Sequence, residues 1–216
     1  MKHTQALCAI SALALLASVS AGGVIYTGSL STGDGGLVAT GDWGGASISW
    51  TVSDQVTHWN YQYTLVVPSG AKAISHFIAE VSPAFQSNDQ FNATGPFAAI
   101  EVGDFTEQNG NFGMPGPFRG IKFDEVDEVT ALVVNFDSYR MPVWGDFYAK
   151  GGGGRNDPSA VWNSGFTAGD PTDPIGNGAL NGHLLRPDTK VPEIPEPATM
   201  SLLALGGLVA LLRRNR

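Results

Sequence analysis

Residues 46–67 read ASISWTVSDQVTHWNYQYTLVV, and this stretch decides the fold class of the chain. Apolar and hydroxyl side chains alternate over residues 46–53, and the apolar residues from Trp59 to Val67 share one face of the second run. A period of two is typical of a strand with one buried face, because successive side chains point to opposite sides. Two such runs separated by the turn 54–57 predict an antiparallel hairpin.

Shorter strands are predicted on both sides of this hairpin, joined by turns rich in Gly and Pro. The chain has 28 Gly, 13 Pro and only 15% charged residues, a composition that favours turn-rich β structure over helices with charged outer faces. The stretch 129–136 is apolar on both faces, so we expect it in the centre of a sheet. The other expected strands are residues 74–81, 98–102, 120–123 and 143–149, with edge strands at 23–30 and 160–166.

These strands predict an all-β fold, an antiparallel β-sandwich of the jelly-roll type. We expect the sandwich to span residues 22–169, flanked by an N-terminal signal helix and a C-terminal hydrophobic helix. Residues 170–191 contain three prolines and show little periodicity, so they are expected to form a stalk.

The N-terminal residues have the pattern of a secretory signal peptide. A basic start is followed by the apolar stretch 7–17 and by small residues that end at Ala21. We therefore expect a signal peptide over residues 1–21, cut by signal peptidase between Ala21 and Gly22. The single cysteine, Cys8, lies in this segment, so the exported part is expected to have no disulfide and to be held together by packing.

The C-terminal residues combine an apolar run with a basic end. Residues 198–212 carry no charge, and Arg213, Arg214 and Arg216 follow them. A helix of this length covers about 22 Å, less than the ~30 Å hydrocarbon core of a bilayer. The arginines favour the cytoplasmic side. This pattern predicts a weak, transient hold in the membrane, and a permanent anchor is the alternative.

Pro195, Glu196 and Pro197 lie immediately before the apolar run. The two prolines hold the chain extended and have no backbone N–H to donate. A protease-like cleft can bind such an extended segment as a strand. In order and spacing, residues 192–216 resemble the PEP-CTERM sorting signal. Tails of this type are also labelled as the ice-binding protein C-terminal domain. The domain itself has no Thr-x-Thr array, so we do not expect it to bind ice.

The resemblance implies an exported protein that an exosortase, a membrane enzyme, cuts near the Pro-Glu-Pro element. It implies passage through the inner membrane of a Gram-negative-type bacterium and delivery to the cell surface or the extracellular matrix. It also implies a link to exopolysaccharide or biofilm assembly, which makes exopolysaccharide a candidate partner.

Charge and motif content restrict the function of the domain between the two ends. Eight basic residues face 20 acidic residues over 22–197, so a nucleic-acid partner is excluded, because such a chain repels phosphate. The sequence has no Gly-x-Ser-x-Gly, His-Glu-x-x-His or phosphate-binding loop motif. We expect a domain that is not an enzyme. The alternatives are a lectin-like carbohydrate-binding module or a secreted carbohydrate-active enzyme.

Two candidate metal sites remain. Asp124, Glu125, Asp127 and Glu128 could bind Ca²⁺, which prefers acidic loops, although they lack EF-hand spacing and such acids are often plain solvated surface. No other cofactor is expected. His58 and His76, both on expected strands, could hold a metal with an acid if they face each other, although surface histidines are the plainer interpretation.

The tryptophans divide into two groups. Trp50 and Trp59 lie on apolar strand faces and are expected in the core. Trp43 and Trp162 lie among Gly and polar residues, so they are the candidates for exposed rings that stack on sugars.

Overall fold

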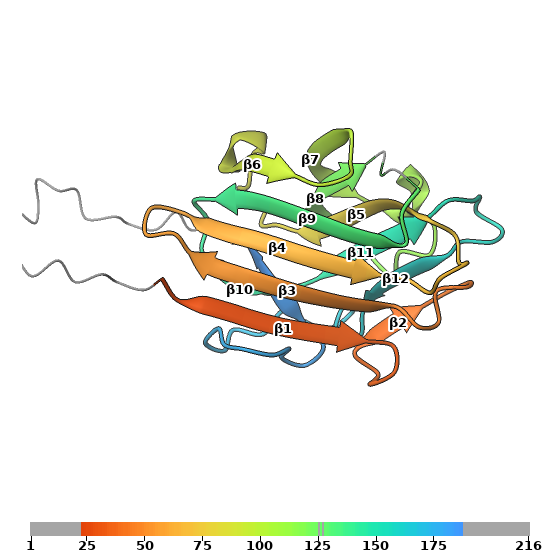
Figure 1. Ribbon diagram of the computed structural model, residues 1–216, viewed down its shortest axis with the longest axis horizontal. Helices are drawn as coiled ribbons and strands as arrows, with labels where there is room; N and C mark the ends of the chain where they lie inside the picture. The colour runs from red at the N-terminus through yellow and green to blue at the C-terminus, as the bar shows by residue number, and fades with distance from the viewer. Residues whose placement is uncertain (1–22, 125, 127, 188–216) are drawn as a thin grey trace, which may run out of the picture.

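The computed structural model describes residues 23–124, 126 and 128–187, which form two packed antiparallel β-sheets (Figure 1). The first sheet has the strand order β1, β3, β4, β9, β6. Its strands are β1 (Ile25–Ser31), β3 (Ser47–Asp54), β4 (Trp59–Val66), β9 (Ala131–Ser138) and β6 (Gln90–Thr94). The expected signal helix and C-terminal hydrophobic helix lie outside the described residues.

The second sheet has the order β2, β12, β11, β5, β8, β7. Its strands are β2 (Leu37–Ala39), β12 (Ala160–Asn163), β11 (Phe147–Gly151), β5 (Ile74–Glu80), β8 (Phe118–Asp124) and β7 (Ala99–Phe105). A separate two-stranded ribbon pairs β10 (Pro142–Gly145) with β13 (Leu184–Pro187). Two short 3-10 turns, η1 (Ser87–Asp89) and η2 (Glu107–Asn109), complete the elements. The prediction of an all-β antiparallel sandwich is confirmed.

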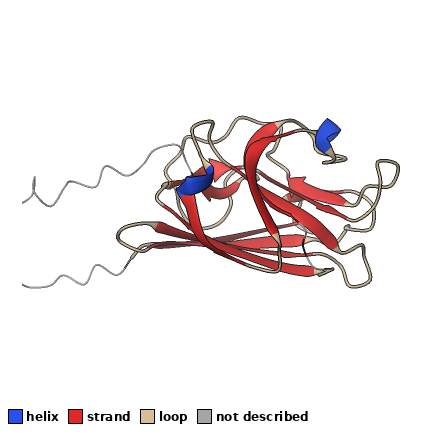
Figure 2. Ribbon diagram, turned by 90° about the horizontal axis from the view of Figure 1, so that it is seen from above, coloured by secondary structure: helices blue, strands red, loops and turns tan. Residues whose placement is uncertain are grey.

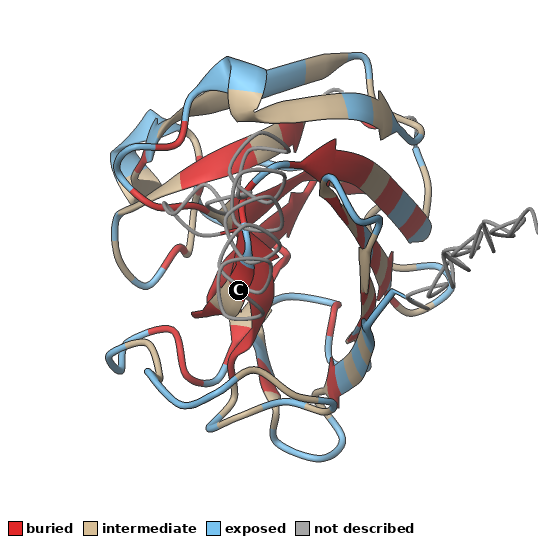
Figure 3. Cartoon of the chain, turned by 90° about the vertical axis from the view of Figure 1, so that its left-hand side faces the viewer, coloured by how far each residue is buried: buried red, intermediate tan, exposed pale blue. Residues whose placement is uncertain are grey.

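The core lies between the two sheets, as the layers in Figure 2 and the buried residues in Figure 3 show. Every second residue of β4 from Trp59 to Leu65 is buried, as the alternation in the sequence predicts. Aromatic rings cross the interface: Tyr63 of β4 lies 5.4 Å from Phe77 of β5 between ring centroids. Ring pairs at this separation stabilise a core beyond the area that they bury.

The predicted hairpin 46–67 is confirmed as β3 and β4, and the edge position of β1 is also confirmed. Trp50 and Trp59 are buried, as expected. Strand β9 lies inside its sheet, between β4 and β6, but Val133 on its outer face is exposed, so its burial on both faces is not observed. Strand β12 is not an edge strand, because it lies between β2 and β11.

The stretch 143–149, expected as one strand, is two. Asp146 separates β10 from β11, and the two strands belong to different sheets. The pattern in the sequence gives no sign of this division, because apolar side chains lie on both sides of Asp146 and both strands are buried.

The expected stalk, residues 170–191, is wrong over its described part. All four residues of β13 are buried, and Leu184 and Leu185 belong to the core between the sheets. The hydroxyl of Tyr63 donates a hydrogen bond to the Leu185 carbonyl oxygen at 2.9 Å. A segment with few periodic positions has therefore become part of the sandwich, because long-range packing overrides a weak local pattern.

Within the described ranges 23–124, 126 and 128–187, no helix has the length and apolar character needed to cross a bilayer. The C-terminal run 198–212 lies outside these ranges.

Candidate functional site

A buried group of charged side chains lies where the β10–β13 ribbon meets the second sheet. We call Glu80, Asp146, Asp170, His183 and Arg186 the His183 cluster. Glu80 ends β5, Asp146 links β10 to β11, and Arg186 lies on β13. The other two come from the loop between β12 and β13, so the cluster joins segments that are far apart in the sequence.

Arg186 is the central cation of the cluster. Its Nε lies 3.2 Å from Glu80 Oε2, and its Nη2 donates to Asp170 Oδ2 at 2.6 Å. Gly145 makes room for this pair, because a Cβ atom there would lie 2.2 Å from Arg186 Nε and 2.6 Å from Glu80 Oε2. The backbone must come this close for the ion pair to form, which explains a glycine inside the ribbon.

His183 is 1% exposed and is held by its own loop. Its Nδ1 lies 3.2 Å from the carbonyl oxygen of Leu180, which can only accept, so Nδ1 carries the proton and donates. A Cβ atom on Gly165 would lie 2.4 Å from His183 Cε1, so only glycine allows the imidazole to take this position. The Nε2 atom therefore points away from Leu180, with its orientation fixed.

The Nε2 atom faces two carboxylates. It lies 3.6 Å from Asp146 Oδ1 and 3.9 Å from Asp170 Oδ1. It has no hydrogen-bond partner among the described residues. Asp146 is oriented in turn by Asn163, whose Nδ2 donates to Asp146 Oδ1 at 2.6 Å and to the Gly182 carbonyl oxygen at 2.9 Å.

The cluster is electrostatically acidic, because three carboxylates surround one guanidinium. Burial raises the pKa of Glu80 to about 7, although the Arg186 charge opposes the shift. Burial also raises the pKa of Asp146, where the hydrogen bond from Asn163 opposes the shift and the charge of Asp170 adds to it. Burial is the main cause of both shifts, and the neighbouring carboxylates add to it.

A second buried histidine lies on the outer face of the second sheet. We call His76, Lys122, Asp124 and Lys150 the His76 cluster. Lys150 of β11 is the cross-strand partner of His76, and Asp124 Oδ1 lies 3.8 Å from its Nδ1. Burial lowers the pKa of His76 to about 3, and the Lys122 charge acts in the same direction while Asp124 opposes it.

The four acids proposed for Ca²⁺ are not assembled over their described part. Asp124 forms an ion pair with Lys122 and faces His76. Glu128 is exposed and lines a separate hollow, and Glu125 and Asp127 lie outside the described residues. Calcium binding at this stretch remains a prediction.

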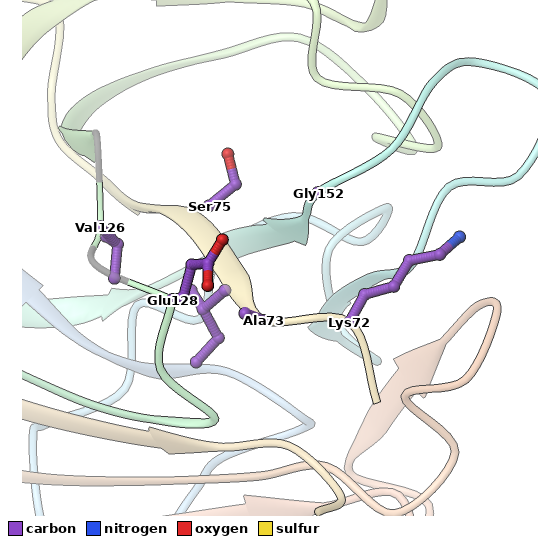
Figure 4. A pocket seen from close by; sticks show the side chains of 7 residues that line it. Lys72, Ala73, Ser75, Val126, Glu128 and Gly152 are labelled. Carbon is purple, nitrogen blue, oxygen red and sulfur yellow. The ribbon is translucent and has the colours of Figure 1, made fainter. Parts of the chain in front are cut away.

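The hollow beside Glu128 has a volume of about 320 Å³ (Figure 4). Ser75 and Glu128 supply its polar side chains, while the amine of Lys72 points away from them. That amine donates to the Asp157 carbonyl oxygen at 2.8 Å and forms an ion pair with its carboxylate. The polar groups of this hollow therefore do not converge on one point, as a catalytic site requires.

Of the two tryptophans proposed to stack on sugars, Trp43 is excluded. It is 0% exposed, and its Nε1 donates to the Lys72 carbonyl oxygen at 2.8 Å. Trp162 is half-buried and packs against a second apolar cluster that includes Tyr148 and Phe166. The glycines around Trp43 suggest exposure, but these residues form the turn that carries the ring inward.

His58 and His76 do not face each other. His58 precedes β4 of the first sheet and lies 3.5 Å from Asp137 Oδ2, whereas His76 lies on the second sheet. Sequence reasoning missed the joining of Asp146, Asp170 and His183, which are the described residues that come together as a group of possible metal ligands. No sequence motif could have indicated these three residues, because they come from separate segments that only the pairing of β10 with β13 brings together.

The comparisons with known proteins concern the C-terminal residues. Residues 193–216 match the family described as the PEP-CTERM protein-sorting motif. No curated protein and no solved structure matches the chain. The match contains Pro195, Glu196, Pro197 and the arginines 213, 214 and 216, and it lies outside the described residues. It confirms the resemblance inferred from those residues: the chain carries a PEP-CTERM protein-sorting motif.

Proposed function

We propose that this chain is an exported, non-catalytic protein of the cell envelope or extracellular matrix, with a β-sandwich as its delivered part. The sorting motif at residues 193–216 carries the proposal, because this motif supports sorting by an exosortase to the cell surface. Signal peptidase first releases the domain at Ala21–Gly22, and the exosortase then cuts near Pro195, Glu196 and Pro197. The membrane contact through residues 198–212 is therefore temporary.

The position of β13 adds a constraint on this processing. The folded domain extends to Pro187, so residues 188–194 lie between it and Pro195, the first residue of the Pro-Glu-Pro element. Even fully extended, the chain from Pro187 to Pro195 reaches about 28 Å at most. The sandwich must therefore lie near the membrane surface while the motif is read, and the processing enzyme must tolerate a folded domain close to its cleft.

The destination links the protein to exopolysaccharide or biofilm assembly. The described domain supports a non-enzymatic role in that setting, because the polar groups of the hollow beside Glu128 do not converge. A lectin-like module is the alternative, for which the half-buried Trp162 is the remaining ring. This alternative is tested by titrating the wild type and Trp162→Ala with the exopolysaccharide of the host and recording tryptophan fluorescence. A lectin-like module predicts that binding is lost in the variant.

The sorting proposal is tested by the C-terminal mass of the mature protein. We expect the native protein to end near Pro197, and replacement of Pro195, Glu196 and Pro197 by alanine to leave it uncut in the inner membrane. The matched control replaces Pro171 and Pro174 by alanine, because these prolines lie outside the motif. A mature protein that still contains Arg216 would show that the tail is only an anchor.

Export is tested separately at the other end of the chain. N-terminal sequencing of the protein from the envelope fraction should give Gly22 as the first residue. An intact Met1 in the cytoplasm would contradict the proposed route, whatever the tail does.

A further inference from the structure

We infer that Asp146, Asp170 and His183 bind one divalent first-row transition-metal ion, for which Zn²⁺ is the appropriate probe. One ligand atom from each residue lies within 4.8 Å of the other two. His183 Nε2 is 3.6 Å from Asp146 Oδ1 and 3.9 Å from Asp170 Oδ1. Two of the three residues, Asp146 and His183, are buried. This site is separate from the sorting motif.

The lone pair of His183 lies on Nε2, the imidazole nitrogen that faces the two carboxylates. The proton of the imidazole is on Nδ1, because Nδ1 faces the Leu180 carbonyl oxygen at 3.2 Å. The Nε2 lone pair then points at Asp146 Oδ1 and Asp170 Oδ1, and Nε2 itself has no hydrogen-bond partner among the residues that the structure describes. Three electron-rich atoms that face each other in a buried place repel one another unless a cation lies between them.

The distances favour a metal ion over a proton. A proton shared with Asp146 or Asp170 requires a donor–acceptor distance of about 3 Å. The Nε2 atom is 3.6 Å from Asp146 Oδ1 and 3.9 Å from Asp170 Oδ1, both too long for that bond. Ligand atoms on one ion with bonds of 2.0–2.2 Å are about 3.3–3.8 Å apart at angles from tetrahedral to 120°. The 3.6 Å separation lies inside this range, and the 3.9 Å separation lies just above it.

The surroundings hold each ligand in place. Leu180 orients His183, Asn163 holds Asp146 at 2.6 Å, and Arg186 holds the other oxygen of Asp170 at 2.6 Å. Outer partners of this kind are typical of metal sites, because they fix the direction of each ligand. Arg186 offsets one of the three carboxylates, so the cluster keeps an excess of negative charge for a cation.

The donor set indicates the class of ion. Imidazole nitrogen suits Zn²⁺ and its neighbours, whereas Ca²⁺ takes six to eight oxygens and Mg²⁺ keeps its waters. The Asp170 side chain is 30% exposed, which gives an ion a way in and leaves room for a water ligand. Bound there, the ion would tie the loop between β12 and β13 to the start of β11. The described residues contain no cysteine, so such a tie would take the place of a disulfide.

The test uses the untagged full chain in detergent, stripped with a chelator and titrated with Zn²⁺ by calorimetry. We expect one Zn²⁺ per chain, a higher melting temperature, and little response to Ca²⁺ or Mg²⁺. Asp170→Asn should weaken Zn²⁺ binding about 100-fold or more, because it removes a ligand while keeping an acceptor for Arg186. His183→Gln should have the same effect, and Co²⁺ in place of Zn²⁺ should give a visible absorption band that both variants lose.

The matched control is Asp124→Asn, which changes the carboxylate beside the other buried histidine and should leave Zn²⁺ binding unchanged. If His183→Gln does not fold, Asp170→Asn decides the result, because Asp170 lies at the exposed side of the cluster. The inference is wrong if the stripped chain takes up no Zn²⁺, or if uptake is the same in Asp170→Asn. A doubly protonated His183 in the nitrogen NMR spectrum, unchanged by Zn²⁺, would also overturn it.

Discussion

The His76 and His183 clusters each contain a histidine buried in the sandwich, but the charged side chains around the two histidines differ. Both imidazoles are almost fully buried, and neither Nε2 atom has a hydrogen-bond partner among the described residues. Two lysines and one carboxylate, Asp124, lie near His76, whereas two carboxylates face His183. Burial alone therefore does not decide what a histidine does. Burial is the largest cause of the lowered pKa of His76, and the Lys122 charge adds to it, whereas the carboxylates that face His183 favour a cation there.

The largest expected effect comes from removing the cation of the His183 cluster. Arg186→Met leaves Glu80 and Asp170 without their partner in a largely buried place. We expect the free energy of unfolding to fall by about 3–5 kcal/mol, because a broken buried ion pair leaves uncompensated charge. Urea denaturation of the wild type and the variant at neutral pH measures the loss. An unchanged midpoint would show that these carboxylates are not held by Arg186.

The next effect concerns pH and His76. The ring has a pKa of about 3 in the folded protein against 6.5 ordinarily, so the unfolded state takes up a proton first as the pH falls. Stability is thus retained above pH 6.5 and decreases as the pH falls toward 3. Between about pH 7.5 and about pH 4.5, the wild type should lose about 2–3 kcal/mol more than His76→Gln.

Glu80 contributes with the opposite sign in the same range. Its raised pKa means that stability is present below pH 4.5 and is lost as the pH rises toward about 7. Only the difference between the wild type and His76→Gln isolates the histidine, so both proteins must be measured at each pH. Parallel stability curves for the two proteins would contradict the prediction for His76.

A smaller effect is expected where the backbone makes room for His183. Gly165→Ala puts a methyl group 2.4 Å from His183 Cε1, and we expect it to cost about 2 kcal/mol of stability. Gly169→Ala in the same loop is the control, since a Cβ atom there meets no atom within 4 Å. Thermal denaturation of the two variants compares them directly. Equal stabilities would mean that the loop moves freely around the imidazole.

The smallest effect is expected from Lys150, the cross-strand partner of His76. Burial and the Lys122 charge lower the pKa of Lys150, so its charge is held at a cost. Lys150→Met should therefore change stability by no more than about 1 kcal/mol, with a gain as the expected sign. Urea denaturation of Lys150→Met and Arg186→Met under the same conditions compares the stability changes in the two clusters. If Lys150→Met loses as much free energy of unfolding as Arg186→Met, the expected difference between the two clusters does not exist.

Much of the framework could be predicted from local patterns. The alternation over residues 46–67 predicts β3 and β4 and the buried face of each, because the period of a strand is set by its own backbone. The division of the chain at Asp146 could not be predicted in this way, since both β10 and β11 are buried and read as one apolar run. The burial of Trp43 likewise depends on a turn whose direction no periodicity encodes.

The candidate site shows the same limit more strongly. From the sequence, His183 is expected in a stalk, and neither Asp146 nor Asp170 stands out as a site residue. These residues meet because β13 pairs with β10 and brings the preceding loop against the start of β11. Such pairing is a long-range contact, and local composition carries almost no information about it.

The all-β class, the hairpin and the PEP-CTERM motif are properties of short stretches, and the order of the residues is enough to establish them. The sorting motif is read as an extended segment by another protein, so its information must lie in consecutive residues. The burial of Trp43, the place of β13 in the core and the two opposite histidine clusters arise when distant segments pack. The charge that a buried side chain meets is decided by its neighbours in space, and those neighbours exist only once the two sheets have closed on each other.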